Sequence, residues 1–172
     1  MLEKLRSLVR DIPDYPSKGI IFRDITPLLC DPAGLSLAVE MMVNPFRGMN
    51  IDIVVGAESR GFIFGTALAR ALNAGFVPIR KKGKLPGNTI SEDYELEYGH
   101  DTLEIHDDAI KSGQRVLMVD DLIATGGTLE AGVKLIKQLG GNLVGISVLI
   151  ELEALNGARL VNPHEVHAVL RY

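Results

Sequence analysis

The chain has 172 residues, of which 47% are hydrophobic and 23% charged, and its formal net charge is −4. These values are typical of one ordinary globular domain with its own core. The negative charge argues against a nucleic-acid or anionic-membrane partner, and no apolar run approaches the ~20 residues that span a bilayer. A single cysteine, Cys30, excludes an internal disulfide and, with an N-terminus too charged for a signal peptide, predicts a cytoplasmic protein.

The N-terminal part is predicted to start as a short helix and continue as irregular cover. Apolar residues at helical spacing predict a helix over residues 2–9. The stretch from Pro13 to Pro32 is dense in Pro and Gly and is predicted to be loop. Asp31-Pro32 is typical of an N-cap followed by Pro at the first helical position, so a helix should run from there towards Phe46.

From residue 51 onward, short apolar strands alternate with amphipathic helices. Strands are predicted over residues 51–55, 76–79, 115–119, 142–150 and 166–170, and helices over residues 61–72 and 128–139. This alternation predicts an α/β fold whose central, mostly parallel sheet is covered by helices on both faces.

A basic stretch interrupts the alternation at residues 80–93, RKKGKLPGNTISED. Its low apolar content predicts a mobile loop. Alternating residues on either side of Gly99 predict a β-hairpin directly after it. A long basic loop on a compact fold indicates a lid over an anion, so about residues 80–106 are predicted to form a mobile lid and hairpin.

The strand before residue 120 leads into VDDLIATGGT, where two adjacent acids precede a Gly-rich turn and a helix. In an open α/β sheet, ligands bind beyond the carboxyl ends of the strands. Backbone N–H groups at a helix N-terminus, with glycines that permit close approach, make a phosphate site, and threonine hydroxyls add donors. The acids would repel a phosphate, so they suit the hydroxyls of a ribose 5-phosphate or a bridging Mg²⁺. The alternative is a solvated turn with a helix cap.

A second strand-to-helix turn, GAESRG at residues 56–61, is also suited to an anion. Arg60 could clamp two phosphate oxygens, or it could be an ordinary surface arginine. Neither G-x-x-x-x-G-K-[ST] nor G-x-G-x-x-G after a strand occurs, which excludes a P-loop ATPase and the common dinucleotide fingerprint.

The apolar strand, the acid pair and ATGGT resemble the 5-phosphoribosyl-1-pyrophosphate signature of the type I phosphoribosyltransferases. GIIFRDITPLL (19–29), GAESRGFIFG (56–65), IRKKGKLPG (79–87) and YELEYGHDTLEIH (94–106) narrow the resemblance to the adenine phosphoribosyltransferases over nearly the whole chain. The resemblance implies the type I fold in a single domain over residues 1–172, with an N-terminal hood over about residues 1–35 that binds the base. It also implies a homodimer, and transfer of the phosphoribosyl group to adenine with Mg²⁺, giving AMP and pyrophosphate in purine salvage.

The resemblance also assigns residues to the substrate. Asp120 and Asp121 would hold the ribose hydroxyls, and Ser59, Arg60 and Lys81 the pyrophosphate. Mg²⁺ would be bound mainly through the pyrophosphate and ribose of the substrate, with no metal site made by the protein alone. The 5-phosphate would be bound by the turn residues Ala124, Thr125, Gly126, Gly127 and Thr128.

Glu97 and Tyr98 match the catalytic loop of the family. A glutamate near the imidazole nitrogens of the base could manage a proton as N9 attacks the sugar, and Tyr98 could shield or position the leaving group. From the pattern alone, Glu95 and Glu97 share one strand face and spacing cannot choose between them. The resemblance selects Glu97.

Ile21, Phe22 and Arg23 are predicted to read the base, by backbone polar groups and by stacking on Phe22, with Leu122 on its other face. Without the resemblance, Phe22 would be an ordinary core aromatic. Two other functions stay open. One is the same transfer to a 6-oxopurine, and the other is a regulator that senses phosphoribosyl pyrophosphate and binds nucleic acid, which should carry an added basic segment.

Overall fold

The computed structural model describes residues 1–95 and 100–172. The chain divides into two compact units, Met1–Met41 and Met42–Tyr172. Within the described residues, none of the helices is both long enough and apolar enough to cross a bilayer.

The first unit contains the predicted N-terminal helix and a small sheet. Its elements are α1 (Leu2–Ser7), the antiparallel strands β1 (Arg10–Pro13) and β2 (Ile21–Asp24), α2 (Thr26–Cys30) and most of α3 (Pro32–Val43), which starts at the predicted Pro32. The 3₁₀ helix η1 (Asn44–Phe46) follows α3 in the second unit.

The prediction that residues 13–32 form only loop was wrong, because β2 and α2 lie within them. Strand β2 pairs with β1, with Phe22 opposite Ile12. Asp24 then stabilises the step into α2, since its Oδ1 accepts the N–H of Thr26 at 2.9 Å and its Oδ2 accepts from Arg10 Nε at 3.0 Å. The density of proline and glycine indicated the turn between β1 and β2, but it gave no sign that the short segments on either side of the turn pair as strands.

The second unit contains the predicted sheet. Its strands run in the order β5-β6-β4-β3-β7-β8-β9, and β4, β3, β7, β8 and β9 are parallel neighbours, while β5 and β6 are antiparallel. This confirms the predicted mostly parallel sheet. The strands are β3 (Ile53–Ala57), β4 (Gly75–Lys81), β5 (Thr89–Glu95), β6 (His100–His106), β7 (Arg115–Ile123), β8 (Asn142–Glu151) and β9 (Val166–Arg171).

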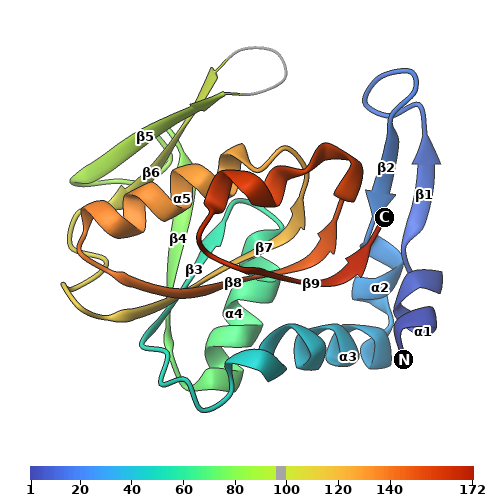
Figure 1. The fold of residues 1–172 in the computed structure, drawn as a ribbon, viewed down its shortest axis with the longest axis horizontal. Helices are drawn as coiled ribbons and strands as arrows, with labels where there is room; N and C mark the ends of the chain where they lie inside the picture. The colour runs from blue at the N-terminus through green and yellow to red at the C-terminus, as the bar shows by residue number, and fades with distance from the viewer. Residues whose placement is uncertain (96–99) are drawn as a thin grey trace. The chain divides into compact units, whose positions relative to one another are not determined.

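Helices α4 (Gly61–Leu72) and α5 (Gly127–Gln138) lie on opposite faces of this sheet, as Figure 1 shows. Val55 and Val77 are paired neighbours on β3 and β4, and both belong to the buried cluster that α5 completes with Leu129 and Leu135. Phe76 points to the other face, since successive residues of a strand alternate. There its ring would lie 2.6 Å from a Cβ at Gly65 of α4, so the glycine lets helix and strand approach closely.

Two strand limits differ from the prediction. Strand β7 was predicted to end at Val119, but it continues to Ile123 because it keeps pairing with β8 after its pairing with β3 stops at Val119. The acid pair therefore lies inside the strand and not after it. Loop was predicted over all of residues 80–93, but β5 starts at Thr89 and pairs with β6 from there, so the predicted hairpin exists and is longer. The turn that was predicted at Gly99 lies outside the described residues.

Candidate active site

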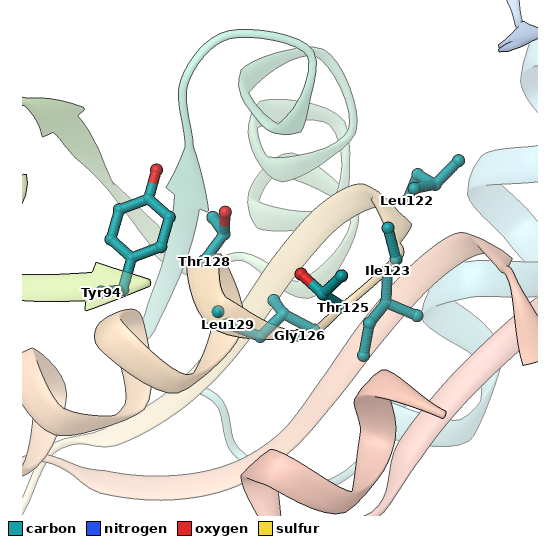
Figure 2. A pocket seen from close by; sticks show the side chains of 9 residues that line it. Tyr94, Leu122, Ile123, Thr125, Gly126, Thr128 and Leu129 are labelled. Atoms are coloured by element: carbon teal, nitrogen blue, oxygen red, sulfur yellow. The ribbon is translucent and has the colours of Figure 1, made fainter. Parts of the chain in front are cut away.

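A cavity of about 170 Å³ lies where β7 turns into α5. Figure 2 shows its lining, with Tyr94 of β5 at one end and Leu122 at the other. The first N–H groups of a helix have no intrahelical carbonyl to bind, and the start of a helix favours negative charge. The turn is therefore suited to a phosphate, and it brings together the five residues predicted to bind one: Ala124, Thr125, Gly126, Gly127 and Thr128. Leu122, which was predicted to pack on the base, lines the same cavity.

The shape of this turn requires glycine at Gly126. Its φ is +93°, a left-handed conformation that side chains disfavour, and it immediately precedes the first residue of α5. A Cβ at this position would be 2.3 Å from the carbonyl oxygen of Gly157, and a Cβ at Gly157 would be 2.3 Å from the carbonyl oxygen of Ala124. Two glycines thus allow two backbone segments to touch behind the phosphate turn.

The acid pair is buried, with Asp120 8% and Asp121 6% exposed. The N–H of Asp121 donates to Asp120 Oδ1 at 2.8 Å. Burial and then the charge of Asp121 raise the pKa of Asp120 well above its ordinary value, while burial raises that of Asp121 and Arg60 opposes the rise. Two adjacent buried carboxylates are costly unless an outside group binds them, and sugar hydroxyls or a cation would do so.

Gly61 makes room for this pair at the start of α4. A Cβ there would be 2.8 Å from Asp120 Oδ1, so the carboxylate lies directly beside the first helical residue. The neighbouring Arg60 reaches Asp121, with Nε 2.7 Å from Oδ2. The turn after β3 is therefore joined by a charged contact to the last residues of β7, as the parallel arrangement of the two strands allows.

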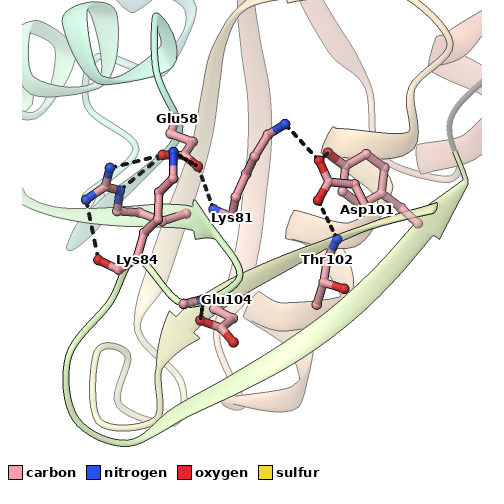
Figure 3. Close-up of polar contacts among 9 residues, drawn as sticks. Glu58, Lys81, Lys84, Asp101, Thr102 and Glu104 are labelled. Atoms are coloured by element: carbon pink, nitrogen blue, oxygen red, sulfur yellow. Dashed lines mark hydrogen bonds and ion pairs between the residues drawn. The ribbon is translucent and has the colours of Figure 1, made fainter. Parts of the chain in front are cut away.

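Glu58, which precedes Ser59 and Arg60, connects the first turn to the basic segment. Its side chain is 6% exposed. Its Oε2 accepts from Arg80 Nε at 3.2 Å and Nη2 at 3.1 Å, its Oε1 accepts the Lys81 N–H at 2.7 Å, and Lys84 Nζ lies 3.5 Å away. Figure 3 shows these contacts converging on one carboxylate. Burial tends to raise the pKa of Glu58, but the Lys81 N–H and the two cationic side chains outweigh it, so the pKa is lowered.

The side chain of Lys81 continues this network towards the cavity. Its Nζ lies 2.8 Å from Asp101 Oδ2, and the Tyr94 hydroxyl lies 3.4 Å from the same oxygen. Tyr94 and Thr128 line the same cavity. Burial and then the charge of Asp101 raise the pKa of Tyr94, and the Thr128 side chain opposes the rise. Polar contacts thus link the basic segment to the phosphate turn.

The other predicted site residues belong to the first unit, lie in the turn after β3 or fall outside the described residues. Ile21, Phe22 and Arg23 belong to the first unit, where Ile21 is 48% exposed, the Phe22 ring packs edge-on against Tyr15 at 5.3 Å, and Arg23 pairs with Asp11. Ser59 is exposed in the turn after β3, and the Glu58–Ser59 peptide bond is cis. The predicted catalytic residues Glu97 and Tyr98 lie outside the described residues.

Four residues of this site were not predicted from the sequence: Glu58, Tyr94, Asp101 and Gly157. Glu58 had a detectable signal, because it stands in GAESRG, directly before the two residues that were selected. Asp101 and Tyr94 face each other only in the actual register of β5 and β6, which the sequence does not state. Gly157 is 30 residues beyond the turn and gives no local signal.

Comparisons with known proteins agree on one family. Residues 25–166 match the family described as "Phosphoribosyl transferase domain". The adenine phosphoribosyltransferase of Rhodopirellula baltica is 60% identical over 168 residues, which cover 98% of this chain and 82% of that protein. The crystal structure of adenine phosphoribosyltransferase from Rhodothermus marinus has a TM-score of 0.95 at 54% identity, with 99% of this chain and 98% of that chain covered.

A more distant relative has the same fold. The Saccharomyces cerevisiae enzyme, solved with an imino-altritol bisphosphate and adenine, has a TM-score of 0.93 at 40% identity, with 98% of each chain covered. By its fold, its strand-to-helix turns and these likenesses, the chain belongs to the type I phosphoribosyltransferases and, within them, to the adenine phosphoribosyltransferase family.

Proposed function

We propose that this chain transfers the 5-phosphoribosyl group of 5-phosphoribosyl 1-pyrophosphate to adenine, giving AMP and pyrophosphate, as a step of purine salvage. The observation that carries the proposal is a buried acid pair directly before a phosphate-sized cavity at a helix N-terminus, Asp120 to Thr128. The names of the relatives, all adenine phosphoribosyltransferases, select adenine as the acceptor.

The sugar phosphate is assigned to the β7–α5 turn. The backbone N–H groups of residues 124–128 and the hydroxyls of Thr125 and Thr128 bind the 5-phosphate. The carboxylates of Asp120 and Asp121 accept hydrogen bonds from the two ribose hydroxyls, which supply the outside partners that a buried acid pair needs. The ribose is thereby fixed at both ends, with its anomeric carbon open to attack from one side.

Pyrophosphate leaves as the glycosidic bond breaks, and the positively charged residues stabilise the charge that develops on it. Arg60 faces the acid pair, and Ser59 stands beside it in the same turn. Lys81 is held close to this turn, since its N–H binds Glu58. Inversion at the anomeric carbon passes through an oxocarbenium-like state, which the carboxylates of Asp120 and Asp121 favour electrostatically.

The base is assigned to groups that come from the sequence pattern and the family resemblance. Glu97 accepts the proton that adenine loses as N9 attacks the anomeric carbon, and Tyr98 shields the leaving group. Ile21, Phe22 and Arg23 read the 6-amino group and N1, while Leu122 packs on the other face of the ring. A 6-oxopurine reverses that donor and acceptor pattern and would leave polar groups unpaired.

Mg²⁺ is proposed to enter with the substrate. The pyrophosphate and ribose of the substrate, with water, would supply most of its ligands. The oxygen donors of Asp120 and Asp121 suit Mg²⁺, directly or through water. When bound, the ion would neutralise part of the pyrophosphate charge.

We also propose that the chain acts as a homodimer in the cytoplasm. The family resemblance supports the dimer, and the lone Cys30, which excludes an internal disulfide, supports a reducing compartment. Light scattering after gel filtration gives the mass in solution, and a monomer would contradict the first statement.

The activity is tested by pyrophosphate release from Mg²⁺-phosphoribosyl pyrophosphate with adenine, hypoxanthine, guanine or no base. Release with adenine alone, matched by AMP, is the expected result. Release with a 6-oxopurine would keep the chemistry but overturn the reading of Ile21, Phe22 and Arg23. Binding of the sugar phosphate without release on any base would favour the sensing regulator.

A further inference from the structure

The Asp101 carboxylate lies between the lysine of the basic segment and a tyrosine of the phosphate cavity. Lys81 is the last residue of β4, and its Nζ is 2.8 Å from Asp101 Oδ2. Asp101 stands directly opposite Tyr94 across the β5–β6 pair. Because the Tyr94 hydroxyl donates to Asp101 and Tyr94 lines the cavity at the start of α5, the Lys81 ammonium is connected by side chains to the wall of that cavity.

Asp101 is itself firmly held. Its Oδ1 accepts the N–H of Thr102 at 2.8 Å, while its Oδ2 receives Lys81 and Tyr94. Both oxygens are visibly engaged in Figure 3. Its side chain is 22% exposed, against 52% for that of Lys81, so the half-buried carboxylate is the fixed partner and the lysine is the one it orients.

A lysine needs such a partner more than most residues do. Its four-carbon stem has many rotamers, and ordering it on a ligand costs conformational entropy. The ammonium has three N–H donors, so a bond to Asp101 leaves donors for an incoming anion. Its hydrogen bond to Asp101 raises the pKa of Lys81, which keeps the ammonium charged. The root of the stem is fixed as well, because the Lys81 N–H binds Glu58.

We propose that Asp101 is a positioning residue that holds the Lys81 ammonium in the direction in which it binds the pyrophosphate group of the substrate. This rests on the proposed function, which assigns Lys81 to pyrophosphate. The opposite arrangement, in which Asp101 withholds Lys81 from the substrate, predicts that Asp101→Ala binds both ligands more tightly than the wild type.

The test is the Kd of inorganic pyrophosphate and of phosphoribosyl pyrophosphate, each with Mg²⁺, measured by calorimetry. We expect Asp101→Ala to weaken both about fivefold. Asp101→Asn should recover most of this loss, because its amide oxygen still accepts from Lys81. Lys81→Met should weaken binding at least as much as Asp101→Ala. In the Lys81→Met background, Asp101→Ala should have no further effect, since a residue that acts through Lys81 has nothing left to position.

Asp93→Ala is the matched control. Asp93 belongs to the same hairpin and accepts from Thr102 Oγ1 at 2.6 Å, so its loss removes a carboxylate near Asp101 without touching Lys81. Its Kd values should match the wild type. Thermal midpoints show whether each variant is folded. Asp101→Val, which suits a strand and cannot accept a hydrogen bond from Lys81, carries the test if Asp101→Ala is not folded, and the same loss of binding is expected.

Unchanged or tighter binding in Asp101→Ala, or additive losses in the double variant, would overturn the proposal. AMP formation by the wild type is measured separately. If the wild type forms no AMP but the losses from Asp101→Ala and Lys81→Met are still non-additive, the adenine activity is refuted and the positioning role stands. If AMP forms but the losses are additive, the positioning role is refuted and the activity stands.

Discussion

Arg60 and Asp121 join the ends of two neighbouring parallel strands, with Arg60 Nε 2.7 Å from Asp121 Oδ2. Asp121 has only 9% of its side chain exposed, whereas Arg60 has 36%. The arginine is therefore the more accessible half of the pair, and its planar guanidinium suits a phosphate group as well as a carboxylate. This contact places the pyrophosphate turn beside the ribose site.

Arg60→Ala is expected to lower kcat/KM for phosphoribosyl pyrophosphate about 100-fold, because it removes a positive charge from the leaving group and leaves Asp121 unpaired. Arg60→Lys should lose less, about tenfold, since the charge stays but the forked donors do not. Steady-state kinetics with varied phosphoribosyl pyrophosphate measure both. Arg70→Ala, at an exposed position in the last turn of α4, is the control, and equal losses in Arg70→Ala and Arg60→Ala would contradict the role.

Glu58→Gln is expected to raise the KM for phosphoribosyl pyrophosphate about fivefold with a smaller change in kcat. The variant loses the charge that holds Arg80 and Lys84, so the basic segment is less well ordered before substrate binds. Glu92→Gln is the control, because Glu92 contacts Lys134 and Gln138 of α5, whereas Arg80 and Lys84 contact Glu58. A KM shift of the same size in Glu92→Gln would mean that general loosening of the sheet edge is the cause.

Gly126→Ala is expected to destabilise the fold by about 2–4 kcal/mol, from left-handed strain plus a clash with the Gly157 carbonyl. Gly113→Ala separates the two causes, since Gly113 also has a positive φ but has nothing within 4 Å of its added Cβ. It should cost only about 1 kcal/mol. Urea unfolding gives both values, and similar losses in the two variants would show that the contact with Gly157 is unimportant.

Asp24→Asn tests the first unit through its pH dependence. Hydrogen bonds from the Thr26 side chain and N–H, and from Arg10, lower the pKa of Asp24 from 3.8 to about 2. A folded pKa below the unfolded value means that the charged form favours folding, so this contribution is complete above the unfolded pKa and disappears as the pH falls through the folded pKa. The wild type should have the higher thermal midpoint above about pH 5, and the gap should shrink towards pH 2. A gap that is constant over this range would contradict the assignment.

Glu97→Gln is expected to lower kcat about 100-fold while leaving the Kd of phosphoribosyl pyrophosphate unchanged, because it removes the proton acceptor and not a phosphate ligand. Glu95→Gln is the natural control, since Glu95 is exposed at the end of β5 and the sequence pattern alone did not separate the two glutamates. Full activity in Glu97→Gln, or a loss only in Glu95→Gln, would reverse the choice.

Much of the fold follows from local pattern. Helix α4 has the predicted bounds, and α5 and the central strands lie within a few residues of theirs, because apolar periodicity reports which face of an element is buried. Apolar periodicity predicted strand bounds wrongly where a neighbouring strand decides how far a strand extends. Strand β7 runs to Ile123 because β8 continues beside it, and β2 exists because β1 pairs with it.

The sequence by itself determined the phosphate turn, since Asp120 to Thr128 are consecutive and a strand that leads into a glycine turn and a helix can present them in only one way. Only the tertiary structure decided which distant groups complete it. Arg60 and Asp121 lie 61 residues apart, and the contacts of Glu58 with Lys81 and of Asp101 with Tyr94 exist because particular strands are neighbours in a particular register. The order of strands in a sheet and their register depend on packing of the whole chain, and no local stretch encodes them.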